Sequence, residues 1–194
     1  MRSTFLPLAL ANRRNAEILR RMPLLGLTDW WLTAGCISQT VWNGLYGRHP
    51  EHGILDYDIF YFDADMSWEA ENAVIAGANA LFRDLPVNVE VRNQARVTHW
   101  YAGKFGVPFP PVTCAANGID RFPCKTVAVG IRRDGDEYLV HAPFGLDLLL
   151  RGKLIPNPVL EIPSVYAAKT ARWLDVWPEL SVEPWPSSRK GVER

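Results

Sequence analysis

The sequence predicts an α/β (α+β) protein in which helices flank a small mixed sheet. Apolar segments of strand length alternate along the chain with segments whose apolar residues recur at helical spacing. Asp134-Gly135 separates two segments of alternating polarity, and this dipeptide indicates an antiparallel β-hairpin. The chain has 194 residues and 48% of them are hydrophobic, so we expect one domain over residues 1–194.

The first elements follow from apolar periodicity and from turn residues. Leu8, Ile18 and Met22 belong to an apolar series at helical spacing, so residues 1–25 predict an N-terminal helix. The next predicted elements are, in order, a short buried strand (30–34), a turn at Gly35, a helix (36–45) and a strand (54–62).

The second half continues the alternation, and capping residues set several boundaries. Asp65 or Ser67 can cap a helix that runs to about Asp84. A final helix spans residues 164–178, begins after a proline and is closed by a proline. The tail (181–194) is polar and contains prolines, which predicts a frayed end. The remaining predicted elements are a strand (87–91), a helix (95–105), a short helix (112–119), the hairpin strands (125–132 and 137–142) and a short helix (144–150).

Two aspartates one residue apart are the strongest functional signal. Asp56 and Asp58 belong to an otherwise apolar strand, where residues i and i+2 project from the same face. Two carboxylates so close repel each other unless a cation lies between them or one takes a proton. A hard divalent ion such as Mg²⁺ accepts oxygen ligands and relieves this repulsion. An edge strand with a polar face is the alternative.

Two further sites accompany the aspartates. Gly35 at the start of a helix lets a phosphate approach the backbone, where free N–H groups attract anions, although a tight turn without a ligand would need the same glycine. Glu90 lies between valines on the next strand and requires a partner if it is buried. That partner is either a metal site or a structural arginine, Arg92 or Arg96.

The order of these pieces resembles the nucleotidyltransferase superfamily related to DNA polymerase beta. More closely, the chain resembles a small bacterial family of nucleotidyltransferase-like proteins, over about residues 30–178. The most specific string is the one that begins at Glu90. The matching strings are Trp31-Leu32-Thr33-Ala34-Gly35, Asp56-Tyr57-Asp58-Ile59, Glu90-Val91-Arg92-Asn93-Gln94-Ala95-Arg96, Ala142-Pro143-Phe144-Gly145-Leu146-Asp147 and Ala167-Ala168-Lys169-Thr170-Ala171-Arg172-Trp173-Leu174.

The resemblance implies a nucleotidyltransferase-like fold and transfer of a nucleoside monophosphate from a nucleoside triphosphate to an acceptor hydroxyl. It implies Mg²⁺ or Mn²⁺ as the cofactor, with Asp56, Asp58 and Glu90 as metal ligands and catalytic residues. The acceptor can be a small molecule, a protein or an RNA end. The nucleotide-binding residues that it implies are Gly35, Cys36, Ser38, Arg92, Arg96, Lys169 and Arg172.

Two departures from the superfamily pattern concern the nucleotide site. Gly35-Cys36 stands where the superfamily has Gly-Gly or Gly-Ser, so phosphate binding there rests on backbone N–H groups. If φ is positive at Gly35, a Cβ at this position would strain the turn. The gap to Asp56 is longer than usual, and the extra loop (47–53) can bring Arg48 or His49 to the site.

Other functions fit the same residues. One alternative is a non-catalytic nucleotide- or metal-binding regulatory protein derived from the same fold. Another is a metal-dependent phosphodiester hydrolase, because acidic metal sites also serve attack by water. Cys36 at a helix start is in addition a candidate nucleophile, since a helix N-terminus lowers the pKa of a thiol.

Composition narrows the partners and the compartment. The formal net charge is zero, so no global positive field attracts nucleic acid and we expect no duplex DNA partner. No apolar run reaches the length that spans a bilayer, and we expect no membrane partner. Three cysteines without regular spacing argue against a disulfide framework and for a reducing compartment, so the expected location is cytoplasmic.

Overall fold

A five-stranded mixed sheet organises the computed structural model, which describes residues 1–187. The spatial order of the strands is β3-β2-β1-β4-β5, and within this sheet only β2 and β3 pair in parallel. The expected mixed sheet is therefore confirmed. The strands are β1 (Trp30–Thr33), β2 (Asp56–Tyr61), β3 (Asn88–Asn93), β4 (Gly130–Asp134) and β5 (Glu137–His141), with a separate parallel pair of β6 (Lys153–Leu154) and β7 (Ser181–Val182).

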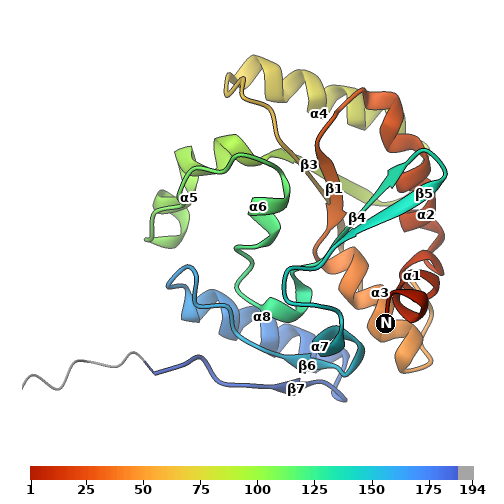
Figure 1. The fold of residues 1–194 in the computed structure, drawn as a ribbon, viewed down its shortest axis with the longest axis vertical. Helices are drawn as coiled ribbons and strands as arrows, with labels where there is room; N and C mark the ends of the chain where they lie inside the picture. The colour runs from red at the N-terminus through yellow and green to blue at the C-terminus, as the bar shows by residue number, and fades with distance from the viewer. Residues whose placement is uncertain (188–194) are drawn as a thin grey trace, which may run out of the picture.

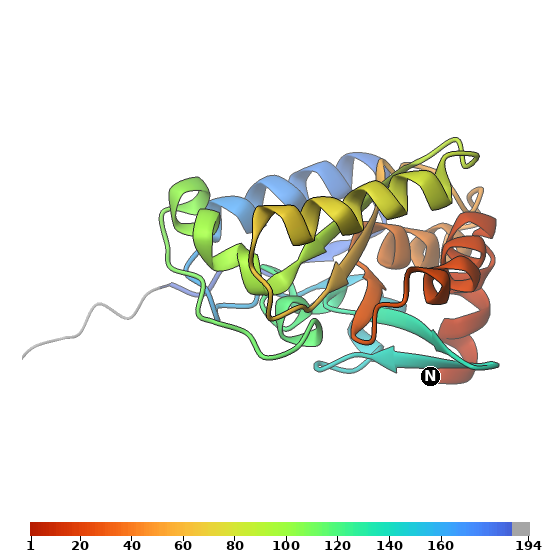
Figure 2. The same cartoon turned by 90° about the horizontal axis from the view of Figure 1, so that it is seen from above.

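Helices surround the sheet, so that α1, α2 and α3 lie to one side of β1 and α5, α6 and α8 lie to the other (Figure 1). Figure 2 shows the β4–β5 hairpin at the margin of the molecule, beside the N-terminal helix. Within the described residues, no helix is long and apolar enough to cross a membrane. The helices are α1 (Arg2–Leu10), α2 (Arg13–Arg21), α3 (Gly35–Leu45), α4 (Trp68–Phe82), α5 (Val97–Phe105), α6 (Ala116–Ile119), α7 (Asp147–Leu150) and α8 (Pro163–Val176), with 3₁₀ turns η1 (Met22–Leu25), η2 (Gln94–Arg96) and η3 (Lys125–Val127).

Several local predictions are confirmed within one or two residues. The side chain of Ser67 accepts a hydrogen bond from the backbone N–H of Ala70 and so caps α4, as one of the two expected caps. Gly135 adopts a φ of +57° at the first central position of the two-residue β4–β5 turn (135–136), where a hairpin turn favours glycine. Both features arise from neighbours in the chain, which explains why periodicity and turn residues predicted them.

The N-terminal segment differs from the single helix expected over residues 1–25. It forms α1 and α2, because the side chain of Asn12 accepts hydrogen bonds from the backbone N–H groups of Arg14 and Asn15 and starts a second helix. The amide of Asn12 also donates to the hydroxyl of Tyr57, at 3.1 Å. Asn12, at the break between α1 and α2, therefore links the N-terminal helices to the strand that carries the two aspartates.

The strand expected over residues 125–132 begins only at Gly130. Its first part forms η3, because Thr126 is engaged with a different segment. The hydroxyl of Thr126 donates to the carbonyl of Lys153 at 2.6 Å and accepts from the N–H of Ile155 at 3.0 Å. Tertiary hydrogen bonds thus override the alternating pattern of this segment.

The C-terminal tail is ordered further than the expectation of a frayed end from Ser181. Ser181–Val182 pairs with β6 as β7, and the hydroxyl of Tyr166 donates to the carbonyl of Glu183 at 2.7 Å. A polar, proline-containing sequence gives no local signal that predicts these hydrogen bonds between distant segments. The rest of the expected tail (188–194) lies outside the described residues.

A cluster of tryptophans fixes α8 against α3. The ring of Trp42 on α3 lies 5.7 Å from that of Trp173 and 5.6 Å from that of Trp177, centroid to centroid. The indole N–H of Trp177 donates to the side-chain carbonyl of Asn43 at 2.8 Å. Trp42 and Trp177 are almost completely buried. This packing holds the C-terminal half of α8 near the β1–α3 turn.

Candidate active site

Asp56 and Asp58 project from one face of β2. Burial alternates along this strand, with Tyr57 and Ile59 buried on the opposite face. In the sheet register, Asp58 of β2 pairs with Glu90 of the neighbouring strand β3. Because paired residues of neighbouring strands share a face, the three carboxylates emerge on the same side of the sheet, as the sequence predicted for the two aspartates.

Two adjoining cavities lie on this face of the sheet. The smaller, of about 190 Å³, is lined by both aspartates, by Gly35 and by cationic residues of α8. The larger, of about 340 Å³, is lined by Asp58 and Glu90 together with many aromatic side chains. Ala34, Asp58 and Lys169 belong to the walls of both. The carboxylates therefore lie where the two cavities meet.

The turn between β1 and α3 is strained at an unexpected residue. Ala34 has a φ of +63° and a ψ of −138°, a conformation that is nearly exclusive to glycine, whereas Gly35 has no positive φ. The condition under which a Cβ at position 35 would strain the turn is therefore not met, and the positive φ of the turn falls on Ala34. Gly35 opens α3 and lines the smaller cavity, and Ala34 offers no side chain that could cap the N–H groups of the first turn.

Ala34→Gly is expected to raise the free energy of unfolding by about 0.5–1 kcal/mol, because relief of strain exceeds the added chain entropy. Ala34→Val should lower the same free energy by about 2 kcal/mol or more, because a β-branched residue is disfavoured at positive φ. Urea denaturation of both variants tests this expectation. A destabilised Ala34→Gly protein would contradict it.

Cations of α8 face the aspartates across the smaller cavity. Lys169 and Arg172 both line this cavity with Gly35. Burial and the neighbouring charge of Arg172 lower the pKa of Lys169, while Asp58 and Asp56 act in the opposite direction. A cavity with two cations and a helix N-terminus in its wall is suited to a phosphate chain.

Burial strongly affects the carboxyl group of Asp58. It raises the pKa of Asp58 to about 7, and the charges of Asp56 and Glu90 contribute to the rise. Lys169 and Arg92 oppose it. Ionisation of Asp58 is therefore unfavourable in the empty site, and a bound cation would stabilise the ionised form.

Glu90 occupies a partly solvated position on β3. Its carboxylate accepts hydrogen bonds from the amide of Asn88 and from Arg92, each at 3.2 Å. Within residues 1–187, no three His, Cys, Asp or Glu side chains gather closely enough to bind one metal ion. The two polar partners hold Glu90 along β3, so the three acids share a face without forming a compact cluster.

A family model described as nucleotidyltransferase matches residues 20–182. The chain belongs to this nucleotidyltransferase family. The protein is accordingly a transferase of nucleotidyl groups, and nucleoside triphosphates are the substrates that the family implies.

A solved structure supports the same assignment. The nucleotidyltransferase is similar to a structure determined by NMR and described as a CCA-adding enzyme head domain, with a TM-score of 0.72 and 25% sequence identity. The match covers 88% of this chain and 90% of that one. No curated protein matched the sequence.

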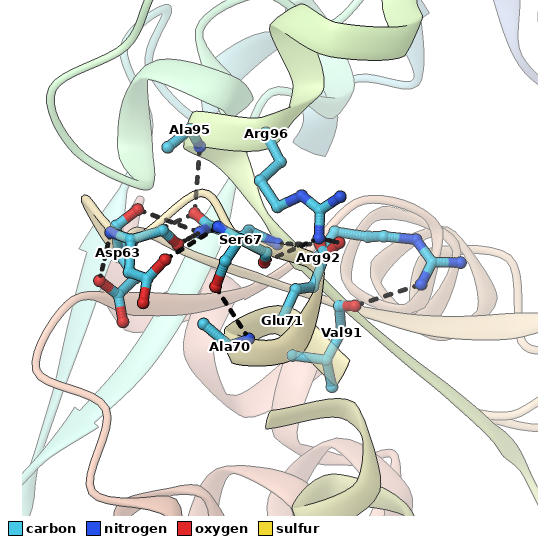
Figure 3. A network of polar contacts seen from close by, with 10 residues as sticks. Asp63, Ser67, Ala70, Glu71, Val91, Arg92, Ala95 and Arg96 are labelled. Atoms are coloured by element: carbon cyan, nitrogen blue, oxygen red, sulfur yellow. Dashed lines mark hydrogen bonds and ion pairs between the residues drawn. The ribbon is translucent and has the colours of Figure 1, made fainter. Parts of the chain in front are cut away.

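In this nucleotidyltransferase, Arg96 lines neither cavity. The guanidinium of Arg96 lies 3.0 Å from the carboxylate of Glu71 and donates to the carbonyl of Ser67, also at 3.0 Å. Glu71 in turn accepts from the N–H of Asn93 at 3.0 Å. Figure 3 shows this network, which joins the start of α4 to the end of β3. The resemblance implied a nucleotide contact for Arg96, whereas its observed contacts are structural.

Two other residues implied by the resemblance are turned away from the cavities. The thiol of Cys36 is fully buried and donates to the carbonyl of Thr33 at 3.1 Å. Burial raises the pKa of this thiol well above its usual range, which opposes a nucleophilic role. The hydroxyl of Ser38 is committed to the carbonyl of Ala34, at 3.2 Å. Arg48, from the extra loop, pairs with Glu179 and lines neither cavity.

Two residues that sequence reasoning missed line the smaller cavity of the nucleotidyltransferase. Gln39 and Trp173 are each 3% exposed. The side-chain oxygen of Gln39 and the indole nitrogen of Trp173 have no hydrogen-bond partner among the described residues. Helical spacing was the available signal, because Gln39 follows Gly35 by one turn and Trp173 follows Lys169 by one turn.

Proposed function

We propose that this nucleotidyltransferase moves a nucleoside monophosphate from a nucleoside triphosphate to an acceptor hydroxyl and depends on a divalent metal ion. The observation that carries the proposal is the pair Asp56 and Asp58, which face a cation-lined cavity from one strand. Their oxygen donors and the raised pKa of Asp58 fit a hard cation such as Mg²⁺ or Mn²⁺. When bound, such an ion neutralises charge on the phosphates and on the departing pyrophosphate.

The chain's own residues would bind the triphosphate in the smaller cavity. Backbone N–H groups of the first turn of α3 donate to phosphate oxygens beside Gly35. Lys169 and Arg172 counter the phosphate charge from α8. The indole N–H of Trp173 would donate to a phosphate oxygen, and the side-chain oxygen of Gln39 would accept from a ribose hydroxyl. These contacts position the α-phosphorus beside Asp56 and Asp58.

Glu90 is the proposed general base. It lines the larger cavity at its junction with Asp58, where it would accept the proton of the attacking hydroxyl. The acceptor oxygen forms a bond to the α-phosphorus while the bond from the α-phosphorus to the pyrophosphate oxygen breaks. The electron pair of that bond leaves with pyrophosphate.

Turnover with labelled nucleotides tests the proposal. The protein is incubated with Mg²⁺ or Mn²⁺ and each of the four α-labelled ribonucleoside triphosphates, with and without cell extract as a source of acceptors. Transfer of label with release of pyrophosphate is the expected result. Release of free monophosphate would indicate the hydrolase instead, and binding without turnover would indicate the regulatory protein.

Glu90→Gln is expected to reduce turnover by about 10²–10³-fold, because it removes a proton acceptor that acts in the transition state. Nucleotide affinity should change less than about twofold. The pair with Arg92 is exposed, so its loss should cost at most about 1 kcal/mol of stability. Stopped-time transfer assays, calorimetry and thermal melts measure the three quantities.

Arg92→Gln is the companion variant, because it breaks the same ion pair and keeps the carboxylate. Arg92 also lines the larger cavity, so nucleotide affinity is measured for both variants. An equal loss of turnover in both, with nucleotide affinity unchanged in both, would assign the effect to the pair. Normal turnover together with a lower melting temperature in Glu90→Gln would show that Glu90 has a structural role and is not the general base.

A further inference from the structure

The larger cavity differs in chemistry from the phosphate site beside it. Its walls come from β2, β3, α5, α8 and the segment around α6, and they are mostly apolar. Trp100 borders it and is 44% exposed. The aromatic residues of the wall are Phe60, Trp100, Tyr101, Phe105, Phe109 and Phe122.

The carboxylates divide between the two cavities. Asp56 lines the smaller cavity, Glu90 lines the larger, and Asp58 lines both. In nucleotidyl transfer the attacking and leaving oxygens lie roughly in line on opposite sides of the phosphorus. If pyrophosphate leaves into the smaller cavity, as proposed above, the attacking hydroxyl must approach from the larger one, where the proposed base Glu90 lies.

Aromatic side chains in the walls of the larger cavity form surfaces against which a flat ring could pack. Phe60 and Phe122 meet edge to face at 5.5 Å on one side. Tyr101 packs at 4.5 Å from Phe105 and 4.8 Å from Phe109 on another. Aromatic faces favour offset or edge contacts with a planar ligand. The volume of about 340 Å³ is that of a small-molecule site.

Two cations accompany the aromatic rings at the α5 side of the cavity. The guanidinium of Arg121 lies over the ring of Phe109 at 4.7 Å, and the amino group of Lys104 lies over the ring of Phe105 at 5.4 Å. Among residues 1–187 neither forms an ion pair with a carboxylate, although the guanidinium of Arg121 donates to the carbonyls of Pro110 and Pro111. An anionic group on the ligand would complement this charge.

We infer that the larger cavity is the acceptor site and that the acceptor is a small anionic alcohol or phenol that contains a flat ring. This inference rests on the proposed function. The ring stacks against the aromatic wall, and its anionic group meets Lys104 and Arg121. Its hydroxyl reaches the α-phosphorus beside Asp58 and gives its proton to Glu90, and pyrophosphate leaves on the far side.

A cavity-filling substitution separates the acceptor site from the nucleotide site. Val165 on α8 lines the larger cavity and not the smaller, whereas Ala168 on the same helix is exposed and lines neither. Val165→Phe should leave the affinity for α,β-methylene-ATP in Mn²⁺ within about twofold by calorimetry. Ala168→Phe is the matched control, and thermal melts confirm that both variants are folded.

The acceptor probes are nucleoside 5′-monophosphates, hydroxybenzoates and a single-stranded RNA octamer. Ligand-observed NMR measures their binding, and mass spectrometry measures their gain of a nucleoside monophosphate. We expect at least one ring-containing small probe to bind and be modified, with a loss of tenfold or more in Val165→Phe and none in Ala168→Phe.

Three results would overturn the inference. One is binding and modification of the RNA octamer alone, another is failure of every small probe to bind the wild-type protein, and the third is weaker nucleotide binding in Val165→Phe, which would place the donor's base in this cavity. Failure of the proposed function is distinguishable from all three. The wild-type protein would then bind no nucleotide in Mn²⁺, would bind it equally well after Asp56→Asn, or would bind it and transfer it to no acceptor in cell extract.

Discussion

Replacement of Asp58 by asparagine is expected to abolish nucleotidyl transfer while making the metal-free protein more stable above neutral pH. Asp58 lines both cavities and, with Asp56, provides the oxygen donors proposed to hold the metal ion. The amide is a poorer ligand and leaves the phosphate charge uncompensated, so turnover should fall by about 10³-fold or more. Asp56→Asn should have a similar effect on turnover.

The stability gain follows from the raised pKa of Asp58. The pKa is about 7 in the folded protein and 3.8 in the reference state, so the folded protein binds the extra proton between about pH 4 and pH 7. Stability attributable to Asp58 is therefore lost as the pH rises through that window. Asparagine cannot ionise, so the variant should match the parent near pH 4 and exceed it by about 1–3 kcal/mol at pH 8.

Urea denaturation in EDTA at pH 4 and pH 8, together with transfer assays in Mg²⁺, measures both effects. Asp175→Asn is the matched control, because it removes an equal charge from an exposed position on α8 that lines neither cavity. Normal turnover in a folded Asp58→Asn protein would refute the catalytic assignment. A stability difference that does not depend on pH would refute the role of the raised pKa.

Removal of the Glu71 carboxylate is expected to have the largest effect on stability. Glu71 is nearly buried and binds both Arg96 and the backbone N–H of Asn93. Glu71→Ala leaves the guanidinium of Arg96 without its counter-charge in a largely buried position, and this should cost about 3–5 kcal/mol. Neither partner lines a cavity, so turnover per folded molecule should be preserved.

Glu69→Ala provides the control, because Glu69 is exposed in the same first turn of α4 and interacts equally with the helix dipole. It should cost less than about 1 kcal/mol. Arg96→Met decides between the two roles of Arg96. A lower melting temperature with unchanged nucleotide affinity supports the structural pair, whereas unchanged melting with weaker nucleotide binding would restore the role that the family resemblance implied.

The sequence by itself determined the elements that depend on neighbours in the chain. Alternation along β2 places Asp56 and Asp58 on one face because a strand has a period of two, whatever the strand packs against. Ser67 caps α4 and Gly135 turns the hairpin through bonds and dihedrals that span only a few residues. The order of these motifs was sufficient to indicate the nucleotidyltransferase family.

Only the tertiary structure decided how those elements combine into a site. Packing of Trp42 against Trp173 brings Lys169 to a turn more than a hundred residues earlier in the chain. Arg96 forms an ion pair with Glu71 of α4, because a nearly buried carboxylate requires a counter-charge. The backbone strain of the β1–α3 turn falls on Ala34 and not on Gly35, which the residue types by themselves do not indicate. Contacts between residues far apart in the sequence carry no periodic signal, and their free energies are settled only when the core packs.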